Sequence, residues 1–368
     1  MFSLLVSRNV SFLSTPTARY MSYISRKSGL PYFKTPNPAL RTSCKQVLQI
    51  QNHICHTGRR GFSSLLTVIG GAAVRRWWFK RPPETRRRYT NTARTYRLTI
   101  IGMTTAFMCL IGTFLSCCME LDPWTDLWRL FVFSERTIEV YDRINVAAIL
   151  AEMTGKRCLL ETEHPTYRRV ASVMSRLLDA NNGVDEIRNR QWSLVVVNHP
   201  TVNAFVSASG FIFVFSGLAA MANDDQLSII VGHELAHVML RHTNHITSVN
   251  FAVHLLCLTP VSMVLSVALP FLWAMLAVMM CRLVLYVCVG LTKERSLETE
   301  ADGLGLLLAA NACVDGTQGY LFWEAMSKIY GPSTRTWWLE THPTNEIRAR
   351  HLHSLIPAAT ELQKLAKC

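Results

Sequence analysis

The segment HELAH at residues 233–237 lies inside an apolar run of helical character. On an α-helix, side chains four positions apart lie one above the other on the same face. His233 and His237 can therefore bind one metal ion together, and Glu234 can reach a water molecule at that metal. The motif alone is a weak signal, because a random chain of this length contains its three specified positions about one time in twenty. A metal site needs a third ligand from elsewhere in the chain.

A pair of carboxylates can complete the site. Glu298 and Asp302 are four positions apart and share one face of a predicted helix. We expect Glu298 to be the third ligand of a His₂Glu site for one Zn²⁺ per chain, and Asp302 to accept the free N–H of a zinc-bound histidine. Glu300 is the competing carboxylate, but it would point away from the face of Asp302. Without HELAH, an acidic helix start would be an ordinary solvated feature.

Together these motifs resemble those of a known family. HELAH, the LETEAD segment at 297–302 and the Thr-His-Pro sequence at 341–343, with Arg348 five residues after the proline, are similar to the HtpX-like and CAAX-prenyl-protease family of membrane gluzincins. The basic leader, one strong membrane span and the GLLLAA segment at 305–310 narrow the resemblance to its mitochondrial inner-membrane metalloendopeptidases, whose activity overlaps that of the matrix-facing AAA protease. The resemblance covers about residues 120–360, and the chain has too few spans for a seven-span prenyl protease.

The resemblance implies roles for further residues. It implies the same three zinc ligands, with Glu234 as the general base. Asp302, His342 and Arg348 are then candidates for contacting the ligands or the transition state. His342 would cover the metal in a resting state or stabilise the oxyanion; the competing interpretation is a turn histidine before a helix that Pro343 opens.

The reaction implied is zinc-assisted peptide hydrolysis, in which Glu234 takes a proton from the attacking water and delivers it to the leaving amine. An exposed strand containing Asn203, Ala204 and Phe205 could bind the substrate as an added strand. The resemblance also implies membrane-protein substrates, including the inner-membrane dynamin-like fusion GTPase, in stress-responsive quality control. The rival interpretations are a zinc-binding membrane scaffold or chaperone, and a related protease of the endoplasmic reticulum. A homo-oligomer is left open.

The pattern of elements predicts an α+β fold that is mainly helical. Amphipathic periodicity indicates helices within residues 120–190, and segments rich in Val, Phe and Ile indicate strands at 192–197 and in a hairpin at 202–215. Asn223 and Gln226 form a capping-box pattern before the helix that carries HELAH. We therefore expect a gluzincin domain with a small antiparallel sheet, anchored by an N-terminal transmembrane helix.

Charge divides the chain into a basic leader and a neutral body. Residues 1–83 contain 13 Lys and Arg and no acidic residue, which predicts a mitochondrial transit peptide and a disordered basic leader, with a generic basic tail as the alternative. The remaining residues sum to zero charge, which argues against a nucleic-acid partner. After a basic segment at 84–97, the uncharged residues 98–119 are long enough to span a bilayer. The positive-inside rule then places the metalloprotease domain (120–360) and the tail (361–368) in the intermembrane space.

A second apolar stretch covers residues 251–291. It contains one charged residue, Arg282, and is broken by Pro260 and Pro270. It could cross the membrane twice, form a re-entrant hairpin, or lie on the surface. An odd number of crossings is excluded, because Glu298 must reach the same side as His233.

The other histidines and the cysteines give weaker signals. His242, His245 and His254 follow the motif and are interpreted as structural or surface residues. The 11 cysteines include no CxxC pair, so neither a cysteine zinc cluster nor a disulfide scaffold is predicted. Cys313 and Cys368 are interpreted as buried or incidental thiols rather than redox-active ones.

Overall fold

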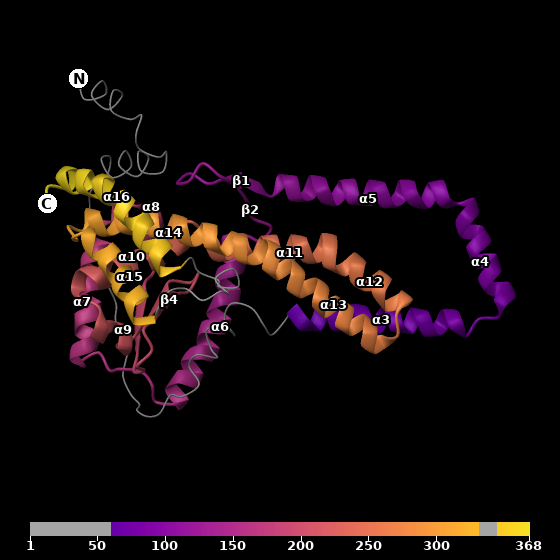
Figure 1. Cartoon of the computed structure of the whole chain (residues 1–368), viewed down its shortest axis with the longest axis horizontal. Helices are drawn as coiled ribbons and strands as arrows, with labels where there is room; N and C mark the ends of the chain where they lie inside the picture. Colours follow the sequence, from indigo (N-terminus) through magenta and orange to yellow (C-terminus); the bar gives the residue numbers. More distant parts are fainter. Residues whose placement is uncertain (1–59, 331–343) are drawn as a thin grey trace, which may run out of the picture.

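The computed structural model describes residues 60–330 and 344–368. It has a helical body, from which long apolar helices extend to one side (Figure 1). The helices of the body are α6 (Glu135–Gly155), α7 (Pro165–Ala180), α8 (Asp185–Arg188), α9 (Ser216–Met221), α10 (Asp224–Met239), α14 (Leu291–Asn311), α15 (Thr317–Tyr330) and α16 (Asn345–Ala366).

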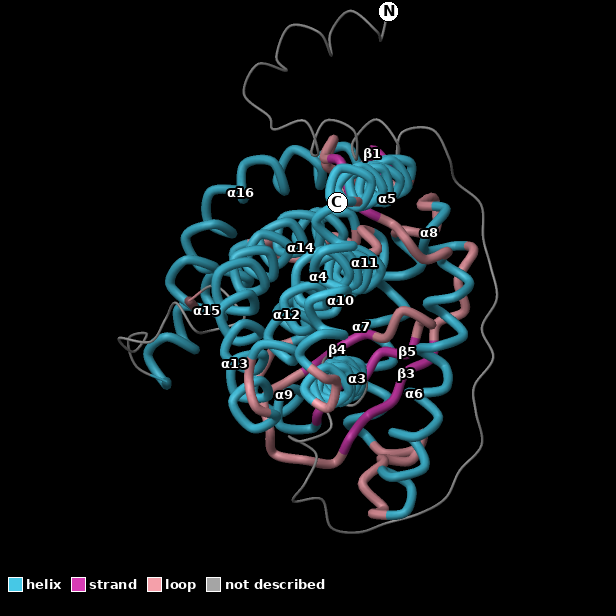
Figure 2. Tube along the Cα trace, turned by 90° about the vertical axis from the view of Figure 1, so that its right-hand side faces the viewer, coloured by secondary structure: helices cyan, strands magenta, loops and turns pink. Residues whose placement is uncertain are grey.

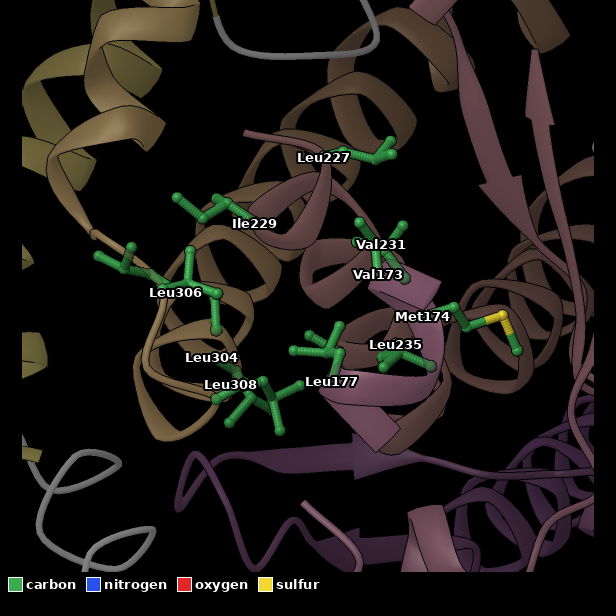
Figure 3. Close-up of a cluster of buried hydrophobic side chains, with 14 of the residues drawn as sticks. Val173, Met174, Leu177, Leu227, Ile229, Val231, Leu235, Leu304, Leu306 and Leu308 are labelled. Carbon is green, nitrogen blue, oxygen red and sulfur yellow. The ribbon is translucent and has the colours of Figure 1, made fainter. Parts of the chain in front are cut away.

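Helices α10 and α14 lie against each other at the centre of the body. Their apolar faces share one buried core with α7. Figure 3 shows the side chains that meet there: Val173, Met174, Leu177, Leu227, Ile229, Val231, Leu235, Leu304, Leu306 and Leu308. The predicted capping box of Asn223 and Gln226 is present and begins α10 at Asp224. The confirmed helix start leaves HELAH in the last two turns of α10.

A three-stranded sheet lies beside this core, with the order β3 (Ser193–Val197), β5 (Phe211–Phe215), β4 (Ala204–Val206). Alternate residues face α6 on one side and the main core on the other, which accounts for the period-two pattern. Figure 2 shows the three strands side by side. The predicted hairpin is the antiparallel pair β4–β5, closed by Gly210 with a φ of 91°. The expectation of a purely antiparallel sheet is wrong, because β3 runs parallel to β5; apolar alternation does not encode strand direction.

A second ribbon follows the predicted span. Strands β1 (Met119–Leu121) and β2 (Trp128–Leu130) pair antiparallel, where the sequence predicted only helices. The buried residue of β2 is Arg129, and its Nε lies 3.1 Å from Oδ2 of the buried Asp122, which directly follows β1. Three-residue strands joined through a buried ion pair give no apolar periodicity, so the sequence pattern did not predict this ribbon.

Within residues 60–330 and 344–368, three helical stretches are long and apolar enough to cross a membrane by length and composition. They are Arg97–Cys117 (α5), His242–Ala268 and Phe271–Asn311. The second contains α11 (His242–Val253), the π-helical turn η2 (His254–Leu258) and α12 (Thr259–Ala268), and the third contains α13 (Phe271–Leu285), the π-helical turn η3 (Tyr286–Gly290) and α14. The predicted anchor is therefore a helix, and residues 251–291 form a helical hairpin that turns at Pro270.

Part of the predicted leader is a packed helix. Helix α3 (Arg60–Phe79) lies against α12, and α4 (Pro83–Thr95) connects it to α5. Val68 is fully buried, and a Cβ built on Gly71 would lie 1.7 Å from Ser266 Oγ. Small residues permit this close approach of two apolar helices. The expectation of disorder is therefore wrong for residues 60–79. The rest of the transit peptide and leader predicted at 1–83 lies mostly in residues 1–59, outside the described residues.

A disulfide joins Cys313, just after α14, to Cys368 beyond α16. The interpretation of these two residues as thiols is wrong. They are 55 residues apart in sequence, and the reversal of the chain through α15 and α16 brings them together. Such long-range proximity leaves no trace in cysteine spacing.

Candidate metal centre

Two glycines bring the backbones of α10 and α14 into contact at the candidate metal ligands. A Cβ on Gly305 of α14 would lie 2.5 Å from the backbone N of His233, and one on Gly232 would lie 2.6 Å from the carbonyl oxygen of Gly305. Only residues without a Cβ allow this approach. As a result, the histidines of α10 face the carboxylates of α14.

The three predicted ligands converge on one point. The Nε2 atoms of His233 and His237 are 3.0 Å apart, and they lie 3.4 and 3.5 Å from the carboxylate oxygens of Glu298. Bonds of about 2.0–2.2 Å at tetrahedral angles require ligand atoms roughly 3.3–3.5 Å apart. The two histidine–glutamate distances match this spacing, and the histidine–histidine distance of 3.0 Å is slightly shorter. Two imidazoles and a carboxylate are also ligands that Zn²⁺ accepts. Among the described residues, this is the group of His, Cys, Asp and Glu with metal-ligand spacing.

Asp302 and Arg348 hold the ring of His233 from behind. The Nδ1 of His233 lies 2.9 Å from Asp302 Oδ1, and Arg348 donates from Nε to Asp302 Oδ2 at 2.8 Å and from Nη2 to Oδ1. The Arg348 guanidinium also lies over the ring of Trp323. Burial and the charge of Arg348 lower the pKa of His233, but hydrogen bonds to Asp302 and Glu298 outweigh them and raise it to about 9. A metal ion at this site would therefore compete with a proton.

The predicted base lies beside the free edge of the sheet. The backbone N–H of Val206, in β4, donates to Glu234 Oε2 at 3.1 Å. Asn203 accepts from Phe215, and Ser207 donates to Phe211, so alternate residues of this strand pair with β5. By this alternation Phe205 also pairs with β5, and its ring stacks on Phe213. The main-chain groups of Ala204 and Val206 are the ones directed to the free edge.

Comparison with known proteins identifies the family to which this site belongs. Residues 165–356 match the model of peptidase family M48, a segment of more than half the chain that includes all three candidate ligands and Glu234. The chain belongs to peptidase family M48. A metal is expected in a metalloprotease family, and the His–His–Glu cluster is the group of described residues that could hold it.

The similar proteins include mitochondrial metalloendopeptidases. The metalloendopeptidase OMA1 of Danio rerio is 33% identical over 272 residues, which cover 73% of this chain and 56% of the relative. The Homo sapiens protein of the same name is 29% identical over 254 residues, covering 68% and 48%. The Saccharomyces cerevisiae mitochondrial metalloendopeptidase OMA1 is 27% identical over 226 residues, covering 57% and 61%. The chain thus spans about half the length of the curated relatives it matches.

The structure brings most of the predicted M48 site together. His233, His237, Glu298, Asp302 and Arg348 form one connected group, whereas His342 lies outside the described residues. The sequence missed two contacts: Val206 at Glu234, and His242, whose ring contacts that of His237. The strand predicted just before the HELAH helix could have suggested the contact between Val206 and Glu234.

Proposed function

We propose that this chain is a zinc metalloendopeptidase of the mitochondrial inner membrane. The observation that carries the proposal is the spacing of the His233, His237 and Glu298 ligand atoms around one point, with Glu234 directly after His233 in α10. Membership in family M48 and relatives named as mitochondrial metalloendopeptidases support it.

The arrangement suits hydrolysis of an amide. When bound, Zn²⁺ supplies Lewis-acid polarisation of the scissile carbonyl. Glu234 takes a proton from the attacking water and transfers it to the leaving amine nitrogen. The N–H of Val206 orients the Glu234 carboxylate, while the Arg348–Asp302 pair holds the ring of His233. The protein thus places the base and the ligand ring before substrate arrives.

An extended peptide is the substrate shape that fits this site. Strand β4 is an edge strand, and the main chain of Ala204 faces its open side, where Glu234 also lies. A peptide added antiparallel or parallel to β4 would bring its backbone past the base. Of the three predicted strand residues, Ala204 is the one placed to pair with a substrate, because Asn203 and Phe205 pair with β5.

Membrane proteins are the substrate class we propose. Helix α5 and the hairpin extend from the same side of the body, so substrates in the same bilayer would be held near the site (Figure 1). The arginines of α4 lie at the other end of α5, and the positive-inside rule puts them in the matrix and the body in the intermembrane space. The inner-membrane dynamin-like fusion GTPase, cleaved under stress, is the first substrate to test. A homo-oligomer of this chain is a further proposal, and the size of the chain in the same vesicle preparation would test it.

The deciding experiment compares the full chain with Glu234→Gln in lipid vesicles that contain the substrate. Glu234→Gln should retain zinc and lose cleavage by at least about 100-fold, because it cannot take up the proton. Glu163→Gln, an exposed glutamate before α7, is the matched control and should cleave normally. Equal cleavage by Glu234→Gln would refute the proposal.

The same variant separates the rival functions in cells. A zinc-binding scaffold or chaperone would restore the phenotype of cells lacking the chain even with Glu234→Gln, whereas a peptidase would not. Import of the chain into isolated mitochondria would exclude the endoplasmic reticulum protease.

A further inference from the structure

The metal ligand His237 has its own partner on the side away from the metal. Its Nε2 faces the other ligands, and its Nδ1 lies 2.8 Å from Nδ1 of His242. The two rings meet edge to face, with centroids 4.9 Å apart. His242 is 2% exposed, so no solvent competes for this contact.

The turn between α10 and α11 creates this contact. Residues five apart do not share a face of one helix. Arg241 adopts a left-handed conformation with a φ of 51°, ends the path of α10 and starts α11 at His242. The first ring of α11 is thereby turned back onto the last turn of α10.

Metal binding determines which nitrogen donates in this pair. A histidine that binds a metal through Nε2 carries its proton on Nδ1, so His237 must donate and His242 Nδ1 must accept. A neutral His242 then carries its own proton on Nε2. That atom lies 3.7 Å from Glu300 Oε2, which is beyond hydrogen-bond distance. The negative charge of Glu300 therefore favours the Nε2–H tautomer electrostatically, without a hydrogen bond.

Glu300 is itself held in place by a buried cation. Arg129 donates from Nη2 to Glu300 Oε2, and its Nε lies 3.1 Å from Asp122 Oδ2. The side chains of Arg129 and Asp122 are 3% and 2% exposed. A continuous series of polar groups therefore connects the β1–β2 ribbon to the metal centre.

We propose that His242, Glu300 and Arg129 are positioning residues for the metal ligand His237. They fix the tautomer and ring orientation of His237 as Asp302 and Arg348 do for His233, and this role rests on the metal site of the proposed function. Arg129 lies outside the residues 165–356 that match the family model. The β1–β2 ribbon, which directly follows α5, is thus part of the metal centre. Removing the anchor helix together with this ribbon would leave the ligand His237 without its positioning residues.

Zinc affinity of the full chain tests the proposal without measuring cleavage. His242→Leu should lower the affinity about 10- to 100-fold in competition with a chelator, as loss of a ligand's hydrogen-bond partner does. His242→Asn should restore most of it, because the amide oxygen can replace Nδ1 as the acceptor. The matched control is His245→Leu, three residues further along α11: His245 is 8% exposed and contacts Leu130 rather than a ligand. An unchanged affinity in His242→Leu, or an equal loss in His245→Leu, would overturn the proposal.

A double mutant and a spectroscopic readout guard against misfolding. The single mutant Glu300→Gln should lower the zinc affinity, but in the double mutant it should add little to the loss caused by His242→Leu, because both residues act through His237. Additive losses would contradict the proposed connection from Glu300 through His242 to His237. The absorption bands of the Co²⁺-substituted chain should shift in His242→Leu and return in His242→Asn. A wild-type chain that binds no zinc would overturn the proposed function as well, whereas a zinc-bound chain without peptidase activity would overturn the function alone.

Discussion

Gly305 offers the sharpest test of how the metal ligands are brought together. In Gly305→Ala the new Cβ would lie 2.5 Å from the backbone N of His233 and 2.6 Å from its Cα. Ordinary contacts of a Cβ begin at 3.4 Å. Because both obstructing atoms are backbone, rotation of a side chain cannot relieve the overlap. Helices α10 and α14 must therefore separate by roughly 0.9 Å at this point, the shortfall from ordinary packing distance.

The separation has two consequences of different size. Overpacking of this kind costs about 1–3 kcal/mol, and the better helix propensity of alanine offsets up to about 1 kcal/mol of it. The net loss in free energy of unfolding is thus modest. The metal site suffers more, since metal–ligand distances tolerate only about 0.2 Å. His233 and Glu298 lie on the two separating helices, so we expect zinc affinity to fall sharply while the fold survives.

Gly303→Ala is the matched control on the same helix. Its Cβ would lie 3.6 Å from Leu355 Cδ1 and 3.8 Å from His351 Nε2, which are ordinary contacts. It should gain up to about 1 kcal/mol from helix propensity and keep its zinc. Denaturant unfolding and metal analysis of both variants in detergent provide the measurements. Equal zinc content in Gly305→Ala and Gly303→Ala would show that the close approach does not set the ligand spacing.

Four further outcomes are expected. Arg348→Leu leaves Asp302 buried without its cation and should cost about 3–5 kcal/mol in denaturant unfolding, with a smaller loss for Arg348→Lys; no loss would contradict the buried pair. Gly71→Leu should lower the melting temperature of the detergent-solubilised chain by displacing α3 from Ser266, whereas Gly70→Leu, with no atom within 4 Å, should not; equal melting would contradict the packing of α3. Ala204→Pro should reduce peptide turnover without loss of zinc, and unchanged turnover would eliminate β4 as the substrate strand. Hydrogen bonds raise the pKa of His233 to about 9, so the chain freed of zinc by a chelator should release a proton when it binds zinc again. The zinc affinity of the chain should therefore fall about tenfold for each pH unit below 9, and a constant affinity from pH 6.5 to 8 would contradict this.

The metal ligands could be predicted because their geometry is encoded locally. His233 and His237, like Glu298 and Asp302, are four residues apart on one helix, and this spacing alone puts each pair on one face. That the two helices meet could be predicted only from the family resemblance and from the need for a third metal ligand. Arg348 entered through the same resemblance, and the structure places its guanidinium on Asp302.

The features that sequence reasoning missed depend on contacts between distant segments or on single backbone angles. His242 reaches His237 only because Arg241 is left-handed, a conformation that no side-chain pattern at this position predicts. Helix α3 has the composition of a leader, and its partner lies in another apolar helix. The Cys313–Cys368 disulfide and the parallel direction of β3 likewise follow from the path of the whole chain.

The hairpin sets the distance between its tip and the metal centre. From Pro270 to Glu298 the chain is helical through α13, η3 and α14, so about 28 residues at 1.5 Å each place the ligand about 42 Å from the turn. The hydrocarbon layer of a bilayer is about 30 Å thick. A hairpin whose tip reaches the far side of that layer would hold Glu298 about 12 Å above the near side, at the level of the lipid headgroups. A site at this height reaches peptide bonds in segments that adjoin the membrane and misses those inside it, so cleavage sites placed progressively further from a substrate's own span should be cut best within the first few residues.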